Sequence, residues 1–204
     1  MPALQTEAVV LAAGRSRRMG ANKQLLPLLG RPAILHCLEA LWQAGFSRPV
    51  VVLSPAGTEI AGVLADRSVT IAWNEEPVCE MADSVRTGLK SSPSTCGALL
   101  VYPADYPLVS SATIADLAQR YEFEPERIII PVYKGRRGHP VLFPRLILEE
   151  LDSEQTLRDV IHSHSADVVH CPVEDEAILL DMDTPADYDL MCFKAAAGTG
   201  RTPD

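Results

Sequence analysis

Short runs of apolar residues alternate along this chain with longer segments of helical periodicity, and this alternation restricts the fold more than any other feature. The apolar runs predict strands at residues 8–11, 49–53, 69–73, 98–102, 127–130, 140–143, 168–171 and 178–180. The helical patterns cover residues 33–44, 58–65, 83–90, 111–121, 146–151, 156–162 and 184–193. Apolar strands that alternate with helices are typical of a parallel sheet covered on both faces. We therefore expect an α/β fold with three layers (α/β/α) around a mostly parallel sheet.

The length and composition of the chain fit one folded domain. It has 204 residues, of which 47% are hydrophobic, so a core of useful size needs no disulfide or metal to support it. We expect the domain to span residues 1–194. Residues 195–204 are small or polar and include Gly and Pro, which predicts a disordered tail. The five cysteines are scattered without a C-x-x-C pair, so we expect buried free thiols.

Charge and hydropathy exclude several classes of partner. The net charge of −9 argues against a nucleic-acid binder and against a protein that binds anionic membranes. No apolar segment is long enough to span a membrane, and the run at residues 8–13 is too short for the core of a signal peptide. We therefore expect a cytoplasmic protein.

The loop after the first expected strand gathers positive charge beside very small residues. In open parallel sheets, ligands bind beyond the carboxyl ends of the strands. Residues 12–14 (AAG) carry so little side chain that a ligand can lie against the backbone, whose N–H groups bind anions in such turns. Arg18 and Lys23 can neutralise a polyphosphate from two sides, and Ser16 adds a hydroxyl donor. The loop therefore predicts a phosphate site, with a solvated basic loop as the plain alternative.

This loop does not match two common phosphate-binding sequences. The dinucleotide fingerprint G-x-G-x-x-G is absent, because only Gly14 and Gly20 occur here. A Walker A loop requires Gly-Lys-Ser/Thr, whereas Gly20 is followed by Ala-Asn-Lys-Gln. A phosphate site in this loop must therefore be of another type.

Two aspartates follow apolar segments at positions suited to a metal ion. Asp105 comes shortly after the strand expected at residues 98–102, and Asp183 precedes the last helix. Asp181 and Asp183 alternate in an extended segment, so their side chains share one face. Mg²⁺ takes one or two carboxylates together with phosphate oxygens and water. As structural alternatives, Asp105 can close a turn ahead of Pro107 and Asp183 can cap a helix.

Two further pairs of residues are candidates for substrate contacts. Asp83 and Ser84 begin an expected helix, where backbone amides and the hydroxyl can bind a pyrimidine edge, or where either residue is an ordinary helix cap. Arg137 and His139 lie in a cationic Gly/Arg loop that suits an anionic, phosphorylated acceptor. A structural loop histidine is the alternative for His139.

Five motifs in order resemble the nucleotidyltransferases that share the fold of the molybdopterin guanylyl- and cytidylyltransferases. They are LAAGRSRRMGANK at residues 11–23, MADSVRTGL at 81–89, LLVYPADYPLV at 99–109, GRRGHPVLF at 135–143 and LDMDTPADY at 180–188. The resemblance implies a Rossmann-like sheet of the nucleotide-diphospho-sugar transferase type. It also implies Mg²⁺-dependent transfer of a nucleoside monophosphate to a phosphate group, with release of pyrophosphate.

The resemblance is strongest to the molybdenum cofactor cytidylyltransferases. Ala-Ala-Gly in the first motif, Gly-His-Pro in the fourth and Asp-x-Asp-Thr-Pro in the fifth resemble that branch. It implies CTP as donor, a phosphorylated pterin (molybdopterin) as acceptor, and a molybdoenzyme or its chaperone as recipient.

The residue roles that the resemblance implies fall into four groups. The catalytic residues are Arg18, Lys23 and Asp105. The nucleotide-binding residues are Leu11, Ala12, Ala13, Gly14, Arg15, Ser16, Arg18, Lys23, Asp83 and Ser84. The metal ligands are Asp105 and Asp183, and the acceptor-binding residues are Arg137 and His139.

Three alternatives remain open from the sequence. One is an enzyme of the same type with another base or acceptor: a guanylyl-, sugar-phosphate or methylerythritol-phosphate nucleotidyltransferase. Another is an NAD(P)-dependent oxidoreductase, which the missing G-x-G-x-x-G disfavours. The third is a non-catalytic protein that binds a nucleotide or cofactor.

Overall fold

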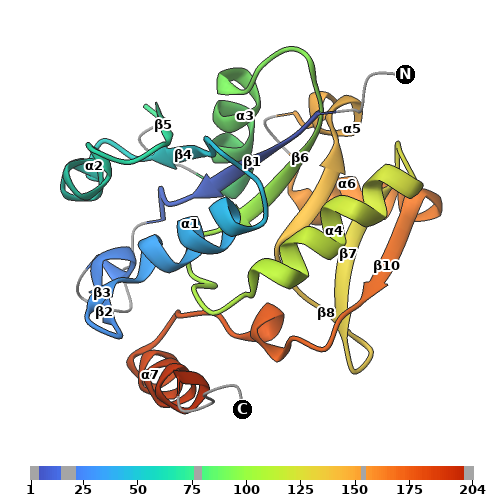
Figure 1. Ribbon diagram of the computed structural model, residues 1–204. Helices are drawn as coiled ribbons and strands as arrows, with labels where there is room; N and C mark the ends of the chain where they lie inside the picture. The colour runs from blue at the N-terminus through green and yellow to red at the C-terminus, as the bar shows by residue number, and fades with distance from the viewer. Residues whose placement is uncertain (1–4, 15–21, 76–79, 153–154, 200–204) are drawn as a thin grey trace.

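A central sheet organises the protein in the computed structural model, which describes residues 5–14, 22–75, 80–152 and 155–199 (Figure 1). The strand order is β10 (Val168–Pro172), β7 (Ile128–Tyr133), β9 (Val141–Pro144), β6 (Cys96–Pro103), β1 (Gln5–Leu11), β4 (Val50–Leu53) and β5 (Thr70–Trp73). β9 runs antiparallel to β6 and β7, and β8 (Arg136–Arg137) pairs antiparallel with β7. The other pairs are parallel, which confirms the mostly parallel sheet.

Helices cover both faces of the sheet, as the apolar strands predicted. α1 (Ala33–Gln43), α2 (Thr58–Leu64) and α4 (Ser111–Phe123) pack on one face. α3 (Met81–Ser91), α5 (Arg145–Glu149) and α6 (Leu157–Ser163) pack on the other. Successive residues of β1 face opposite layers, since Ala8 and Val10 belong to the first core cluster and Val9 and Leu11 to the second. The three-layer architecture is therefore confirmed.

One glycine allows a helix to approach the central strand closely. A Cβ atom at Gly88, in the middle of α3, would lie 2.2 Å from Cγ1 of Val9 in β1. A glycine inside a helix normally costs stability relative to alanine. Here it lets α3 lie against the strand whose carboxyl end leads into the candidate phosphate loop.

The last helix is longer than the sequence analysis predicted. α7 (Pro185–Thr199) begins after Thr184, whose hydroxyl accepts the Asp187 N–H at 3.3 Å. It continues past Phe193, and Ala195 is buried against a small cluster that includes Met191. The expectation of a disordered tail is thus wrong for residues 195–199, because a run of alanines favours helix. Residues 200–204 lie outside the described part of the chain.

A short hairpin that the sequence analysis did not predict packs against α7. β2 (Pro27–Leu28) and β3 (Arg31–Pro32) pair antiparallel. The turn between them has positive φ at Leu29 (50°) and Gly30 (77°). The Tyr188 hydroxyl of α7 donates to the Pro27 carbonyl at 2.6 Å, and Leu28 is fully buried beside this helix.

The segment expected to form a strand at residues 178–180 is mostly a turn of 3₁₀ helix. This turn is η3 (Glu176–Leu179), and the Asp175 carboxylate accepts the Ala177 N–H at its start, at 3.0 Å. That side-chain cap stabilises a turn where the apolar run by itself favoured a strand.

Among the described residues, no helix is long and apolar enough to cross a membrane.

Candidate active site

The small-residue loop and the loop carrying Asp105 leave the sheet side by side. Leu11, the last residue of β1, pairs with Pro103, the last residue of β6. The Ala104 N–H then donates to the Leu11 carbonyl at 3.0 Å, beyond the end of the sheet ladder. Gly14 is exposed, and a Cβ atom placed on it would meet no atom of the described residues within 4 Å. Both predicted segments therefore open at the same carboxyl edge, with room beside the backbone.

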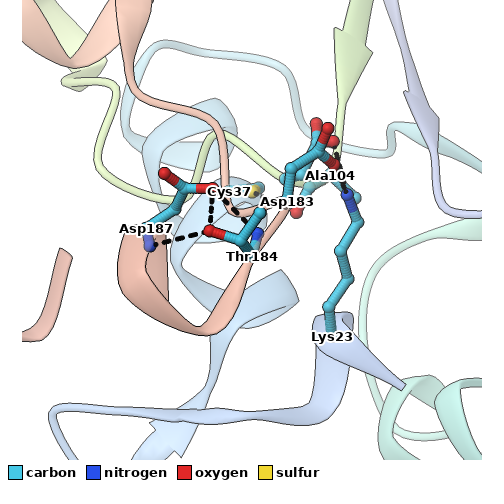
Figure 2. Close-up of polar contacts among 7 residues, drawn as sticks. Lys23, Cys37, Ala104, Asp183, Thr184 and Asp187 are labelled. Atoms are coloured by element: carbon cyan, nitrogen blue, oxygen red, sulfur yellow. Dashed lines mark hydrogen bonds and ion pairs between the residues drawn. The ribbon is translucent and has the colours of Figure 1, made fainter. Parts of the chain in front are cut away.

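Lys23 joins the two aspartates that the sequence analysis selected. It begins the 3₁₀ helix η1 (Lys23–Leu25), and its Nζ lies 2.7 Å from Asp105 Oδ2 and 2.8 Å from Asp183 Oδ1. Figure 2 shows its side chain extended toward Asp183 and the loop at Ala104. Burial lowers the pKa of Lys23, but the charges and hydrogen bonds of the two carboxylates outweigh it and raise the pKa overall. Lys23 is therefore a cation at neutral pH.

The backbone holds the two aspartates together independently of the lysine. The Met182 N–H donates to the Asp105 carbonyl at 2.9 Å, which fixes the segment before α7 to the loop after β6. Thr184 and Asp187 cap α7 directly after Asp183 (Figure 2). Asp183 therefore leads into a helix whose cap is supplied by its neighbours, and its own carboxylate points to Lys23.

The two carboxylates suit a divalent metal of the Mg²⁺ type. Oδ1 of Asp105 is buried without a hydrogen-bond partner among the described residues, although its other oxygen contacts Lys23. No group of three or more His, Cys, Asp or Glu side chains in the described ranges could hold a metal. Mg²⁺ requires no such group, because one or two carboxylates suffice when phosphate oxygens and water complete its coordination. The residues present therefore fit a metal that binds together with a phosphate substrate.

Asp181 adds negative charge beside Asp183 and Asp105. Burial, followed by the nearby charge of Asp183, raises the pKa of the Asp181 carboxyl. A second carboxylate placed so near to Asp183 increases the attraction of this edge for cations.

Asp83 and Ser84 come together near the start of α3, but in roles that the sequence analysis did not separate. Glu80, not Asp83, is the N-cap of α3, and the Asp83 carboxylate accepts the Glu80 N–H at 2.8 Å. Asp83 also forms an ion pair with Arg86. Ser84 is buried, and its hydroxyl accepts from the Asn74 amide at 3.4 Å. Their predicted contact with a nucleobase stays a prediction.

Arg137 and His139 line a pocket of about 800 Å³ beside the carboxylates. The His139 ring stacks at a tilt on Tyr106, with 4.9 Å between centroids, and the His139 N–H donates to the Ile178 carbonyl at 2.9 Å. Burial lowers the pKa of His139, against the opposing charges of Asp105 and Asp181. The sequence analysis missed Tyr106, although its position directly after Asp105 was a usable signal.

Three predicted nucleotide-binding residues of the phosphate loop lie outside the described part of the chain. They are Arg15, Ser16 and Arg18, which belong to residues 15–21. Their predicted roles in nucleotide binding and catalysis therefore stay predictions.

Cys37 packs beside this site as a buried thiol. Cys37 is fully buried, and its Sγ donates to the Ala104 carbonyl at 3.7 Å (Figure 2). Burial raises the pKa of the Cys37 thiol to about 12, which keeps it from acting as a nucleophile. The other described cysteines, Cys96, Cys171 and Cys192, are also free thiols.

Sequence comparison with known proteins finds one family over most of the chain. The MobA-like NTP transferase domain matches residues 8–168. The bifunctional protein GlmU of Parvibaculum lavamentivorans is 32% identical over 166 residues, which are 78% of this chain and 35% of GlmU. The chain thus spans about a quarter to a third of the length of the GlmU proteins that it matches.

Solved structures match nearly the whole chain. Rv0371c from Mycobacterium tuberculosis superposes with a TM-score of 0.81 and 28% identity, covering 95% of this chain and 100% of that chain. Its complex with manganese gives a TM-score of 0.78 and 26% identity over 93% and 98% of the two chains. Molybdopterin-guanine dinucleotide biosynthesis protein A from Archaeoglobus fulgidus has a TM-score of 0.71 at 19% identity, over 94% and 99%, which is a likeness of fold. The nucleotide-diphospho-sugar transferase fold is thereby confirmed.

Proposed function

Because the chain belongs to the MobA-like NTP transferase family, and so to the nucleotidyltransferases, we propose that it transfers CMP from CTP to a molybdopterin-type acceptor and releases pyrophosphate. The observation that carries this proposal is the meeting of Lys23, Asp105 and Asp183 at the carboxyl edge of β1 and β6. Nucleotidyl transfer brings two polyanions together, so charge neutralisation and alignment are the main requirements. A lysine and two carboxylates at the same edge meet both requirements.

Each charged group has a distinct task in this proposal. Asp105 and Asp183 would hold Mg²⁺, which when bound neutralises charge on the α-phosphate and aligns it for attack. Lys23 and Arg18 bind the phosphates of the nucleotide, and residues 12–14 leave space for it against the backbone. The manganese in the Rv0371c complex supports a divalent metal in this fold. No covalent nucleophile is required from the protein.

The choice of CTP and of a pterin acceptor has narrower support. It rests on the likeness of Ala-Ala-Gly, Gly-His-Pro and Asp-x-Asp-Thr-Pro to the cytidylyltransferase branch. Arg137 and His139 line a pocket adjacent to Asp105, where they suit an acceptor that carries phosphate. The finished product would pass to a molybdoenzyme or its chaperone.

Pyrophosphate release tests the proposal directly. The purified protein is incubated with Mg²⁺, each of the four NTPs, and either molybdenum-loaded molybdopterin, a hexose 1-phosphate or methylerythritol phosphate. We expect release with CTP and molybdopterin only. Release with GTP, or with another acceptor, would replace the proposed substrates and keep the reaction type. CTP that stabilises the protein in a thermal melt without any release would instead indicate a non-catalytic binding protein.

The metal assignment is tested by Asp105→Asn, which keeps the shape of the side chain and removes its charge. We expect turnover to fall by about 10²–10³-fold, because charge stabilisation at the reacting phosphate is lost. Asp66→Asn, at an exposed position, is the matched control and should keep full activity. Normal pyrophosphate release by Asp105→Asn at limiting Mg²⁺ would disprove the role of Asp105.

A further inference from the structure

The pocket beside Arg137 and His139 extends away from the carboxylates, between the sheet and α6. Its inner wall is formed by Val101, Ile130 and Phe143, which come from β6, β7 and β9. Its outer wall includes Leu157 and Ile161 of α6. The pocket therefore runs under a helix and is not confined to the open edge of the sheet.

The unequal covering of the two sheet faces leaves this space. On the α1 side, α1 and α4 (Ala33–Gln43 and Ser111–Phe123) pack over the sheet. On the opposite side, β7 and β9 are covered by two much shorter helices, α5 and α6. A hollow beside apolar side chains costs stability. A volume of about 800 Å³ is also in the range of small-molecule sites, which are mostly apolar with a few polar groups.

Apart from the half-buried His139, the polar side chains that line the pocket are few and exposed. Arg137 and Arg158 are exposed cations, and Glu80 and Thr156 are exposed as well. Val101, Ile130 and Phe143 are each no more than 2% exposed and offer no hydrogen bond from their side chains. A sugar carries a hydroxyl on nearly every carbon, and each hydroxyl that loses water without a new partner costs free energy. The walls therefore disfavour a polyhydroxylated acceptor.

The pocket begins where the transfer reaction would occur. Pro103 and His139 both line the pocket. Pro103 is the last residue of β6 and lies two positions before Asp105. The His139 ring stacks on Tyr106, the residue directly after Asp105. An acceptor in the pocket can thus direct its phosphate toward Asp105 while its body lies along the sheet face. Arg137 and Arg158 can pair with further anionic groups of the acceptor.

We propose that the space between the sheet face (Val101, Ile130, Phe143) and α6 (Leu157, Ile161) is a specificity subsite that binds the flat, ring-shaped body of the phosphorylated acceptor. This inference rests on the proposed function, because it takes the acceptor to be the second substrate. It identifies pocket residues whose shape and apolar side chains select the acceptor. Apolar walls accept an aromatic body and leave sugar hydroxyls unpaired.

Direct binding measurements separate this inference from the proposed reaction. Isothermal titration calorimetry is run with neopterin monophosphate as the ring-bearing probe, glucose 1-phosphate as the sugar probe, and CTP with Mg²⁺ as the donor. The wild type should bind neopterin monophosphate at least about tenfold more tightly than glucose 1-phosphate. Equal binding of the two probes, or tighter binding of an isoprenyl monophosphate than of the pterin, would overturn the ring subsite.

Filling the pocket tests which residues form the subsite. Ile161→Trp should weaken binding of neopterin monophosphate about tenfold or more and leave CTP binding within about twofold of wild type. Leu146→Trp is the matched control, because Leu146 is 70% exposed on α5 and outside the pocket. Leu157→Phe is the milder second variant if circular dichroism shows that Ile161→Trp is unfolded.

The outcomes distinguish the two proposals. Unchanged binding of neopterin monophosphate in folded Ile161→Trp or Leu157→Phe would overturn the subsite. If CTP binding weakens as much as neopterin monophosphate binding, the subsite is also overturned, because the pocket then binds the donor. If the probe pattern is as expected but no NTP gives pyrophosphate, the reaction proposal fails and the subsite stands.

Discussion

The Lys23 ammonium lies 2.7 Å from the Asp105 carboxylate and 2.8 Å from the Asp183 carboxylate. It therefore takes the position between them that a divalent cation needs. Mg²⁺ lies only about 2.1 Å from its oxygen ligands. A metal that contacts both Asp105 and Asp183 would therefore lie close to the Lys23 nitrogen, and the two cations would repel each other. The phosphates of a nucleotide offer Lys23 another anionic partner, so metal and nucleotide should bind cooperatively.

Lys23→Met tests this competition. Without the ammonium the two carboxylates repel each other, and we expect the metal-free protein to lose about 2 kcal/mol of stability. Mn²⁺ alone should then raise the melting temperature of the variant more than that of the wild type, while pyrophosphate release falls by about 10²-fold or more.

Thermal melts with and without MnCl₂ measure the first effect, and Lys90→Met on the exposed surface of α3 is the control. If Mn²⁺ stabilises Lys23→Met no more than wild type, the ammonium does not compete with the metal.

His139 should make stability depend on pH. Burial lowers its pKa in the folded protein, whereas the unfolded imidazole titrates near its ordinary value of about 6.5. Below that pH the unfolded chain binds more protons, so the unfolding free energy should decrease as pH falls from 7 to 5. Urea unfolding across this range should show a smaller decrease for His139→Gln than for wild type. His170→Gln, at an exposed position of β10, should keep the wild-type slope; a wild-type slope in His139→Gln would refute the assignment.

The aspartates, the lysine and the histidine could be selected from the sequence because polar residues after buried strands are exceptional. The residues of the pocket wall could not. Ile130 and Phe143 have the same apolar pattern as the residues that fill the core, and only the lengths of the helices opposite them leave a hollow. The sequence analysis offered Asp83 or Ser84 as a helix cap, whereas Glu80 is the N-cap, because Glu80 and Asp83 can each cap a helix and the choice depends on where the chain turns.

Among the strands, the direction of β9 is the feature that the residue pattern could not reveal. An apolar run such as residues 141–143 looks the same whether it runs parallel or antiparallel to its neighbours. The β2–β3 hairpin was missed for another reason: Gly30 signals a turn, but a leucine at positive φ beside it is an uncommon partner. The position of β9 between β6 and β7 nevertheless decides where His139 lies.

Gly138 holds the loop before β9 against η3. A Cβ atom there would lie 2.3 Å from the Ile178 carbonyl oxygen, and the Gly138 N–H donates to the Pro131 carbonyl at 2.9 Å. We expect Gly138→Ala to cost about 1–3 kcal/mol of stability and to raise the KM for the acceptor, because the loop must move and carries His139 with it.

Urea unfolding and pyrophosphate assays measure these two effects. Gly62→Ala, on α2, where a Cβ atom meets none of the described residues within 4 Å, should be neutral or stabilising by about 0.5–1 kcal/mol. A stability of Gly138→Ala equal to that of wild type would show that the loop yields without cost.

The end of the described chain is packed onto a segment near its beginning. Met191 of α7 is 1% exposed and packs with Leu28, Ala33 and Met182. Met191→Ala should destabilise the protein by about 2–4 kcal/mol, which lowers the melting temperature by about 5–15 °C for a domain of this size. Leu190→Ala, at a position 44% exposed on the same helix, should change stability by no more than about 0.5 kcal/mol. Equal melting temperatures for the two variants would show that α7 does not stabilise the molecule.

The separation of Lys23 and Asp183 along the chain has a consequence for how the protein is made. The two residues are 160 positions apart, yet they share a hydrogen bond. At a synthesis rate of about 5–20 residues per second, Asp183 leaves the ribosome roughly 8–30 seconds after Lys23. A nascent chain therefore presents its basic loop to the cell's nucleotides well before it has the second acid. A chain that terminates ahead of Asp183 keeps the loop but lacks the second carboxylate.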